Sequence, residues 1–192
     1  KIIEKIVKFS IKSKIPVLTF YTFSTENWKR PRSEIKFLFK LIDNYFIKEI
    51  NNLIENNIKI NIIGDIKKLP RKIKLRLQES IKRTKKCSKI LVNLAINYGS
   101  KDEIINSIRL MKKRKIKVSI KNFETNLYTS KIPDPDILIR TGGKKRLSNF
   151  LLWQLAYSEL YFLDKLWPDF TTADFNNVIK NFKKVKRNYG KI

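Results

Sequence analysis

The chain has 192 residues, 42% of them hydrophobic, which is enough for one domain with a substantial core. It contains no histidine, so imidazole general bases and histidine-ligated zinc sites are excluded. Its formal net charge is +26, which narrows the classes of partner to be considered.

A charge of this size is typical of proteins that bind nucleic acid or acidic membrane surfaces. The basic residues, however, are spread along the whole chain beside isoleucine and asparagine, as in KIIEKIVK and NNLIENNIKIN. Lysine, isoleucine and asparagine all have codons rich in A and T, so a biased base composition of the genome accounts for the charge. No helix-turn-helix, RNA-recognition or zinc motif accompanies it. We therefore expect no specific nucleic-acid partner, and nucleic-acid binding stays an alternative.

The sequence also restricts the cellular compartment. Cys87 is the only cysteine, which excludes an intrachain disulfide and favours a reducing, cytoplasmic location. The longest uncharged run, Leu147 to Ser158, is shorter than the roughly 20 residues that a membrane-spanning helix requires. We expect a soluble protein with at most peripheral membrane contact.

Apolar periodicity predicts helices and strands that alternate along the chain. Val17 to Phe23 is a near-continuous apolar run of strand-forming residues, which is typical of a strand buried on both faces. Alternation with helices implies right-handed crossovers, so we predict an α/β fold: a single domain, 1–192, with a central, mostly parallel sheet flanked by helices. The predicted elements are helix 1–14, strand 17–23, helix 33–56, strand 58–63, helix 70–85, strand 90–96, helix 101–113, strands 136–139 and 159–162, and a last helix from Thr171 or Thr172.

Polar clusters follow three of these strands, at Ser24 to Pro31, at Asn97 to Gly99 and at Arg140 to Ser148. Ligands of open parallel sheets bind at the carboxyl ends of the strands. Arg140 and Arg146 bracket a Gly-Gly turn, which lets backbone and guanidinium groups approach a phosphate closely. The pattern indicates an anion site, and an ordinary basic loop is the alternative.

Longer segments resemble the cis-prenyltransferase family, undecaprenyl diphosphate synthase type. Its two best-marked motif regions are similar to LTFYTFSTENWKRPRSEI and IRTGGKKRLSNFLLWQLAYSELYFLDKLWPDF, and the blocks between them are similar to INIIGDIKKLP, NLAINYGSKDEI and LYTSKIPDPDILIRTGG. The resemblance covers nearly the whole chain. It implies a homodimer that uses Mg²⁺ to add isopentenyl diphosphate in cis to an allylic diphosphate, usually farnesyl diphosphate. The implied product is a long-chain polyprenyl diphosphate such as undecaprenyl diphosphate, held in a hydrophobic tunnel.

The resemblance also implies roles for single positions. Arg140, Arg146 and Ser148 match residues that hold the diphosphate of isopentenyl diphosphate, and Glu159 matches a Mg²⁺-binding glutamate. Asn27 matches a proposed proton acceptor, but a neutral amide is a poor base, so we interpret it as an orienting hydrogen bonder. Substrate contacts are further implied for Ser24, Thr25, Glu26, Trp28, Arg30 and Leu147, and tunnel-lining positions for Thr22, Leu38, Leu41, Ile42 and Ile90.

Structural roles are the alternatives for several of these residues. Trp28 and the one-sided helical set of Leu38, Leu41 and Ile42 also suit plain core packing, and Glu159 also suits a salt bridge at a strand end. A non-catalytic partner subunit is the alternative for the whole protein. Such subunits usually lose the substrate-contacting residues, which are present here.

The sequence departs from the family pattern at both ends and in one loop. Lys145 stands where bacterial members often carry histidine. Asn188 replaces the second arginine of the family's Arg-Arg-aromatic-Gly tail, so the phosphate contact of that arginine would fall to Arg187 or Lys191. The family's first strand and phosphate loop, approximately Met-Asp-Gly-Asn-Gly-Arg-Trp-Ala, have no counterpart, and the chain begins at Lys1. We therefore expect a domain incomplete at its N-terminus that, alone, is poorly soluble and shows no farnesyl-dependent elongation.

Overall fold

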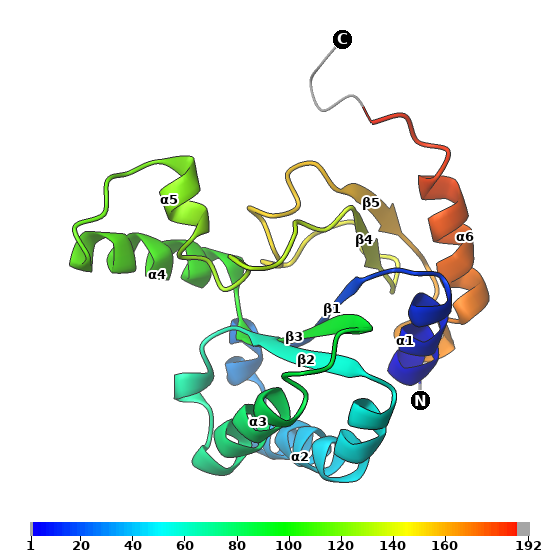
Figure 1. The fold of residues 1–192 in the computed structure, drawn as a ribbon, viewed down its shortest axis with the longest axis horizontal. Coiled ribbons are helices and arrows are strands. Elements are labelled where there is room, and N and C mark those ends of the chain that lie inside the picture. The colour runs from blue at the N-terminus through cyan, green and yellow to red at the C-terminus, as the bar shows by residue number, and fades with distance from the viewer. Residues whose placement is uncertain (1, 188–192) are drawn as a thin grey trace.

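The computed structural model describes residues 2–187. Helices and strands alternate through most of this range (Figure 1), as the periodicity predicts. The helices are α1 (Ile2–Lys12), α2 (Arg32–Glu55), α3 (Arg71–Arg83), α4 (Ser100–Lys113), α5 (Ile120–Glu124) and α6 (Thr172–Phe182), with short 3₁₀ helices η1 (Thr25–Lys29), η2 (Ile66–Lys68) and η3 (Trp167–Asp169). The strands are β1 (Val17–Ser24), β2 (Ile58–Ile63), β3 (Ile90–Tyr98), β4 (Ile137–Arg140) and β5 (Glu159–Phe162).

All strand pairs are parallel, which confirms the predicted α/β class. The pairing differs from the expectation of one sheet, because it forms a three-stranded sheet, β1-β3-β2, and a separate two-stranded sheet, β4-β5. Within residues 2–187 no strand pairs with the second edge of β1 or of β4. Alternation of elements along a sequence predicts strands but not which strands pair, so this division was not predictable.

Packing on the two faces of the three-stranded sheet explains why β3 is buried along almost its whole length. Helices α2 and α3 cover one face, where Phe39, Phe46 and Leu77 join Val92 in the main core (Figure 1). The segment after β4 covers the other face, where Phe150 packs near Ala95. A central strand in a parallel sheet is expected to be continuously apolar for this reason.

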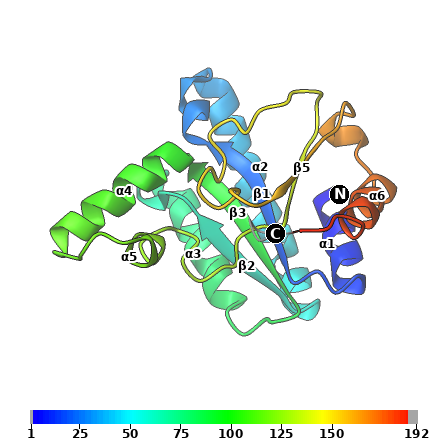
Figure 2. The ribbon, with the colours of Figure 1, turned by 90° about the horizontal axis from the view of Figure 1, so that it is seen from above.

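Helices α1 and α6 lie side by side at the β1 end of the molecule (Figure 2). Phe9 and Phe175 join them edge to face, with ring centroids 5.7 Å apart. The start of α6 is fixed by Thr171, whose hydroxyl accepts a hydrogen bond from the Asp174 backbone N–H, while the Asp174 carboxylate accepts one from the Thr171 N–H. This reciprocal cap is the predicted helix start.

Two local features were missed in the sequence. Helix α5 is too short to show a period of its own and depends on Ser119, whose hydroxyl caps it by accepting from the Asn122 N–H. Strand β3 runs on through Asn97, which was expected to follow the strand and has a left-handed φ of 50°. In residues 2–187, no helix is long and apolar enough to cross a membrane.

Candidate active site

The loop after β4 is built around Arg140, the last residue of that strand. Its guanidinium donates to the Ser148 hydroxyl at 2.8 Å and to the Arg146 carbonyl oxygen, so the loop folds back over the strand end. Gly142 and Gly143 have φ of 88° and 68°, a region that side chains disfavour. We call residues 140–149 the arginine loop.

The electrostatics of the arginine loop suit an anion. Burial, followed by the neighbouring charge of Arg146, lowers the pKa of Arg140, yet arginine stays charged in proteins. Within residues 2–187, neither guanidinium forms an ion pair with a carboxylate. Two close cations without an internal counter-ion favour a multivalent anion such as a diphosphate.

The segment after β1 contacts the arginine loop directly. The Asn149 amide donates to the Glu26 carboxylate at 2.8 Å. Burial alone would raise the pKa of Glu26, but the hydrogen bonds from Asn149 and from its own segment outweigh burial and lower it. The carboxylate is therefore ionised and positioned. Asn149 was not predicted as a site residue, although it follows Ser148 directly and shares its left-handed backbone.

The segment after β1 also bonds to Asn97, at the end of β3, and to Asp102 of the following helix α4. The Trp28 indole donates to the Asn97 side-chain oxygen at 2.7 Å, and the Thr25 hydroxyl donates to Asp102 at 3.2 Å. Asn97 also donates to the Asp65 carbonyl oxygen at 2.7 Å. Hydrogen bonds thus join the segments at the carboxyl ends of β1, β3 and β4.

Asn27 points its amide group in a defined direction. Its side-chain oxygen accepts a hydrogen bond from the backbone N–H of Ser24, the N-cap of η1, at 2.9 Å. The amide hydrogens therefore remain as the groups with which Asn27 can bind a ligand. The arrangement favours a donor to an anion over a proton acceptor. Trp28 packs on Phe23 and Phe39, so its core role exists beside any contact with substrate.

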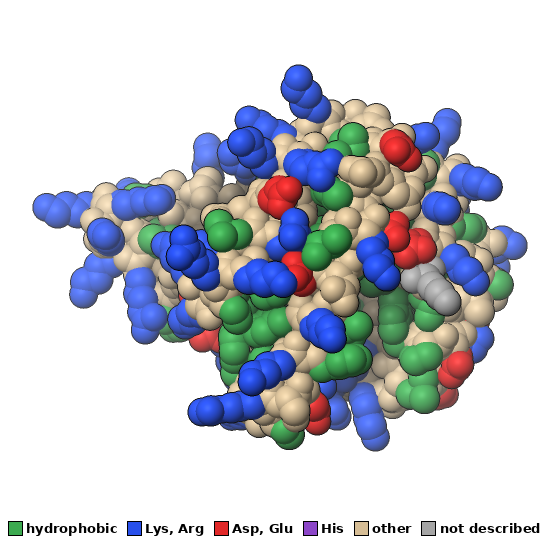
Figure 3. All heavy atoms as spheres, turned by 90° about the horizontal axis from the view of Figure 1, so that it is seen from below, with side chains coloured by type: hydrophobic (Ala, Val, Ile, Leu, Met, Phe, Trp, Pro, Cys, Tyr) green, Lys and Arg blue, Asp and Glu red, His purple; other side chains and the backbone are tan. Residues whose placement is uncertain are grey.

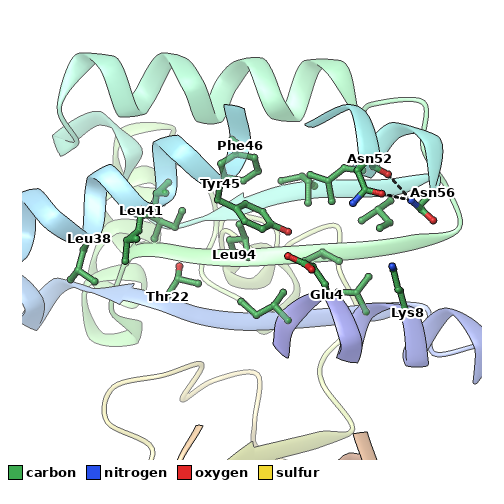
Figure 4. A pocket seen from close by; sticks show the side chains of 18 residues that line it. Glu4, Lys8, Thr22, Leu38, Leu41, Tyr45, Phe46, Asn52, Asn56 and Leu94 are labelled. Atoms are coloured by element: carbon green, nitrogen blue, oxygen red, sulfur yellow. Dashed lines mark hydrogen bonds between the residues drawn. The ribbon is translucent and has the colours of Figure 1, made fainter. Parts of the chain in front are cut away.

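An apolar cavity of about 420 Å³ lies between α1, α2 and the three-stranded sheet (Figure 4). Four of the five residues expected along a tunnel line it: Thr22, Leu38, Leu41 and Ile42. Thr22 stands two residues before Ser24 in β1, so the cavity begins beside the polar site. In Figure 4 it runs from Leu38 and Thr22 toward Lys8, Asn52 and Asn56.

Ile90, the fifth expected tunnel residue, does not line this cavity. It is only 1% exposed and lies in the main core at the start of β3. Because side chains alternate along a strand, it shares a face with Val92 and Leu94, which do line the cavity. Ile90 therefore sits just beyond the cavity, beside Ile58 of β2.

Comparison with known proteins identifies the family of this chain. A family model described as "Putative undecaprenyl diphosphate synthase" matches residues 1–190. The chain belongs to this cis-prenyltransferase family. An isoprenyl transferase of Wolinella succinogenes is 44% identical, over 99% of this chain and 83% of the relative. Another, of Oceanobacillus iheyensis, is 41% identical over 99% of this chain and 78% of its own.

Two solved structures of the family share the fold. A probable undecaprenyl diphosphate synthase from Campylobacter jejuni is 37% identical with a TM-score of 0.91, covering 98% of this chain and 90% of that one. Lavandulyl diphosphate synthase from Lavandula x intermedia, in complex with dimethylallyl diphosphate, is 29% identical with a TM-score of 0.92, covering 98% and 84%. Proteins with this fold are therefore named as synthases of more than one product.

Glu159, which matches the family's metal-binding glutamate, does not lie beside the arginine loop. It pairs with Ile137 at the first position of β5, whereas Arg140 pairs with Phe162 at the last. Three strand positions separate them, about 10 Å along the sheet. In residues 2–187 no group of three potential metal-binding side chains is found. Within one chain, Glu159 and Arg140 thus lie at opposite ends of the β4-β5 pair, and the Mg²⁺ role of Glu159 stays a prediction.

The remaining predicted residues lie at the rim. Lys145 and Arg146 are exposed, Leu147 is half-buried against Phe150, and Arg30 pairs with Glu34 on the surface at 3.6 Å. The Arg187 guanidinium contacts Asp136 and the Tyr157 carbonyl oxygen, at the end of the β4-β5 sheet away from the arginine loop. Asn188 and Lys191 lie outside the described residues.

Proposed function

We propose that this protein condenses isopentenyl diphosphate in cis with an allylic diphosphate, farnesyl diphosphate, to make a long-chain polyprenyl diphosphate, namely undecaprenyl diphosphate. One observation carries the proposal: the arginine loop is bonded to the segment that follows β1, and an apolar cavity reaches Thr22 near the same end of β1. The substrate class has the same two parts, a diphosphate and an apolar tail.

Each part of the site has a chemical task in this proposal. Arg140 and Arg146 bind the diphosphate of isopentenyl diphosphate, with Ser148 oriented by Arg140. The Asn27 amide donates a hydrogen bond that orients the reacting groups, and a diphosphate oxygen takes the C2 proton. Burial of a five-carbon unit in the cavity contributes about 4 kcal/mol, at about 0.8 kcal/mol per carbon.

A Mg²⁺ cofactor and a homodimer also belong to the proposal. Mg²⁺ is commonly held by substrate phosphates with one or two carboxylates. Because Glu159 lies away from Arg140 within one chain, we assign no step to the metal. The exposed apolar side chain of Leu160 on β5 is where we place the contact with a second copy. We further propose a cytoplasmic protein with peripheral membrane contact through its lipid product.

The test measures incorporation of radiolabelled isopentenyl diphosphate with farnesyl diphosphate, with Mg²⁺ or EDTA. It uses this chain alone and the chain preceded by the expected Asp-Gly-Asn-Gly segment. Mg²⁺-dependent long-chain products from the extended chain support the proposal. A single condensation without further elongation, or no activity in either form, would contradict it; the latter outcome favours the partner-subunit alternative.

A further inference from the structure

The outward side of α2 carries an unusual set of exposed side chains. Phe37 is 60% exposed and Ile47 is 50% exposed, and Leu41 accompanies them. At about 100° per residue, these three and the exposed Lys40 and Lys48 fall within roughly one third of the helix circumference. We call these five residues the α2 outer face. Seen from below, Figure 3 shows hydrophobic side chains among lysine and arginine side chains on this side of the molecule.

The acidic residues of α2 are almost all directed elsewhere. Asp43 is buried against α3, where it pairs with Lys72 at 2.7 Å and Arg76 at 3.1 Å. Glu34 pairs with Arg30, and Glu49 accepts a hydrogen bond from Asn52. Only Glu55, at the C-terminal end of the helix, lies on the same side as the outer face. The α2 outer face is therefore apolar and cationic.

The apolar cavity reaches the surface beside this face. Leu41 belongs both to the cavity lining and to the outer face, and Lys8 of α1 lines the opposite side (Figure 4). Leu41, Lys8, Asn52 and Asn56 are all exposed although they line the cavity. The cavity therefore has exposed lining residues on both α1 and α2, and one of them, Leu41, follows Lys40 directly and lies one turn after Phe37.

We propose that the α2 outer face docks on an anionic lipid bilayer, with the opening of the cavity turned toward the lipid. Exposed aromatic and aliphatic side chains mixed with lysine are typical of helices that lie in a membrane interface, and the lysine stems let the ammonium groups reach the headgroups. Anionic lipid attracts such lysines. The passage of a growing polyprenyl tail from the cavity into lipid rests on the proposed function, whereas docking itself does not.

Two other partners fit the same face less well. In a twofold contact the same patch faces itself, so Lys40 and Lys48 of one copy would meet those of the other. Nucleic acid would match the lysines but would leave Phe37 and Ile47 without an apolar environment, since phosphate contacts dominate such binding. Only a bilayer offers anionic groups above an apolar layer.

Vesicle co-sedimentation of the purified protein tests the docking without substrate. Vesicles of phosphatidylcholine are compared with vesicles containing about one third phosphatidylglycerol. We expect binding only to the anionic vesicles. The test variant is Phe37→Ser with Ile47→Ser, which keeps the net charge and changes no residue assigned to the site. We expect its vesicle affinity to fall about tenfold, because the apolar anchors are lost.

A matched control removes apolar residues elsewhere. Ile105 and Ile108 of α4 are 48% and 51% exposed on a helix that also carries lysines. Ile105→Ser with Ile108→Ser should bind vesicles as the parent protein does. Equal binding by all three proteins would show attraction by net charge alone, and equal losses in both variants would show that apolar residues contribute without a specific face. Either result overturns the proposal. Sedimentation velocity identifies the other outcome: a dimer that only the α2 variant dissociates, with vesicle binding unchanged, assigns the face to a second copy.

The result does not depend on catalysis. A protein that binds vesicles through Phe37 and Ile47 but elongates nothing would contradict the proposed function and leave the docking intact. An active enzyme whose α2 variant binds vesicles as well as the parent protein would contradict the docking and leave the proposed function intact.

Discussion

The indole nitrogen of Trp28 donates a hydrogen bond to the side-chain oxygen of Asn97, 2.7 Å away, and so fastens the segment after β1 to the end of β3. Trp28→Phe removes the donor and leaves a buried amide oxygen without it. We expect a loss of about 1–3 kcal/mol in the free energy of unfolding, measured by urea denaturation, and a lower kcat/KM for isopentenyl diphosphate. Trp153→Phe is the control, since that indole donates to Glu124, away from the site. Equal kinetic losses in both variants would argue against a specific role for the Trp28–Asn97 bond.

Arg140→Ala should raise the KM for isopentenyl diphosphate about 10- to 100-fold, because a charge-assisted hydrogen bond contributes roughly 1.5–3 kcal/mol. The KM of Arg140→Lys should lie between the wild-type value and that of Arg140→Ala, since lysine keeps the charge but lacks the planar guanidinium group. Lys144→Ala, which removes an exposed cation of the same loop, should change KM little. Steady-state kinetics of the extended chain decide the matter. If Arg140→Ala and Asn27→Ala both keep wild-type kinetic constants, the arginine loop does not bind the substrate.

The capping carboxylate Asp174 gives a prediction on pH. Hydrogen bonds from Lys165 and then from Thr171 lower its pKa to about 2. A carboxyl with a depressed folded-state pKa stabilises the fold above its unfolded pKa, near 3.9, and loses this contribution as pH falls toward the folded value. Asp174→Asn should therefore lower Tm at pH 5–7, with the difference shrinking from about pH 4 and vanishing near pH 2. Asp169→Asn serves as the control, and a difference independent of pH would refute the explanation.

Product length should respond to the wall of the cavity. Val92 lines it directly, so Val92→Phe should shorten the products seen by reverse-phase chromatography at little cost in stability. Ile90→Trp should also shorten them, but in a packed core just beyond the cavity it should cost about 1–3 kcal/mol or more. An unchanged product ladder for Ile90→Trp in a folded protein would exclude Ile90 from length control. The same result for Val92→Phe would place the tail elsewhere.

Much of this architecture is encoded locally and was therefore predictable. Segments rich in apolar, strand-forming residues locate β1, β2 and β3 within one or two residues, and the arginines around Gly142 and Gly143 indicate the anion site. What could not be predicted depends on contacts between distant segments. The Asn149–Glu26 bond joins residues 123 positions apart, and no periodicity reports it. The position of Glu159 relative to Arg140 likewise follows from strand register, which the sequence alone leaves open.

The division into two sheets has a consequence for hydrogen exchange. The amides of β3 are buried and bonded on both sides, so they should exchange with solvent only when the whole domain unfolds. Strands β4 and β5 have four residues each, partly exposed, and pair only with one another within residues 2–187, so their amides should exchange through local opening. The arginine loop is thus anchored in the part of the domain that opens first, and a bound diphosphate should slow exchange in β4 well before it affects β3.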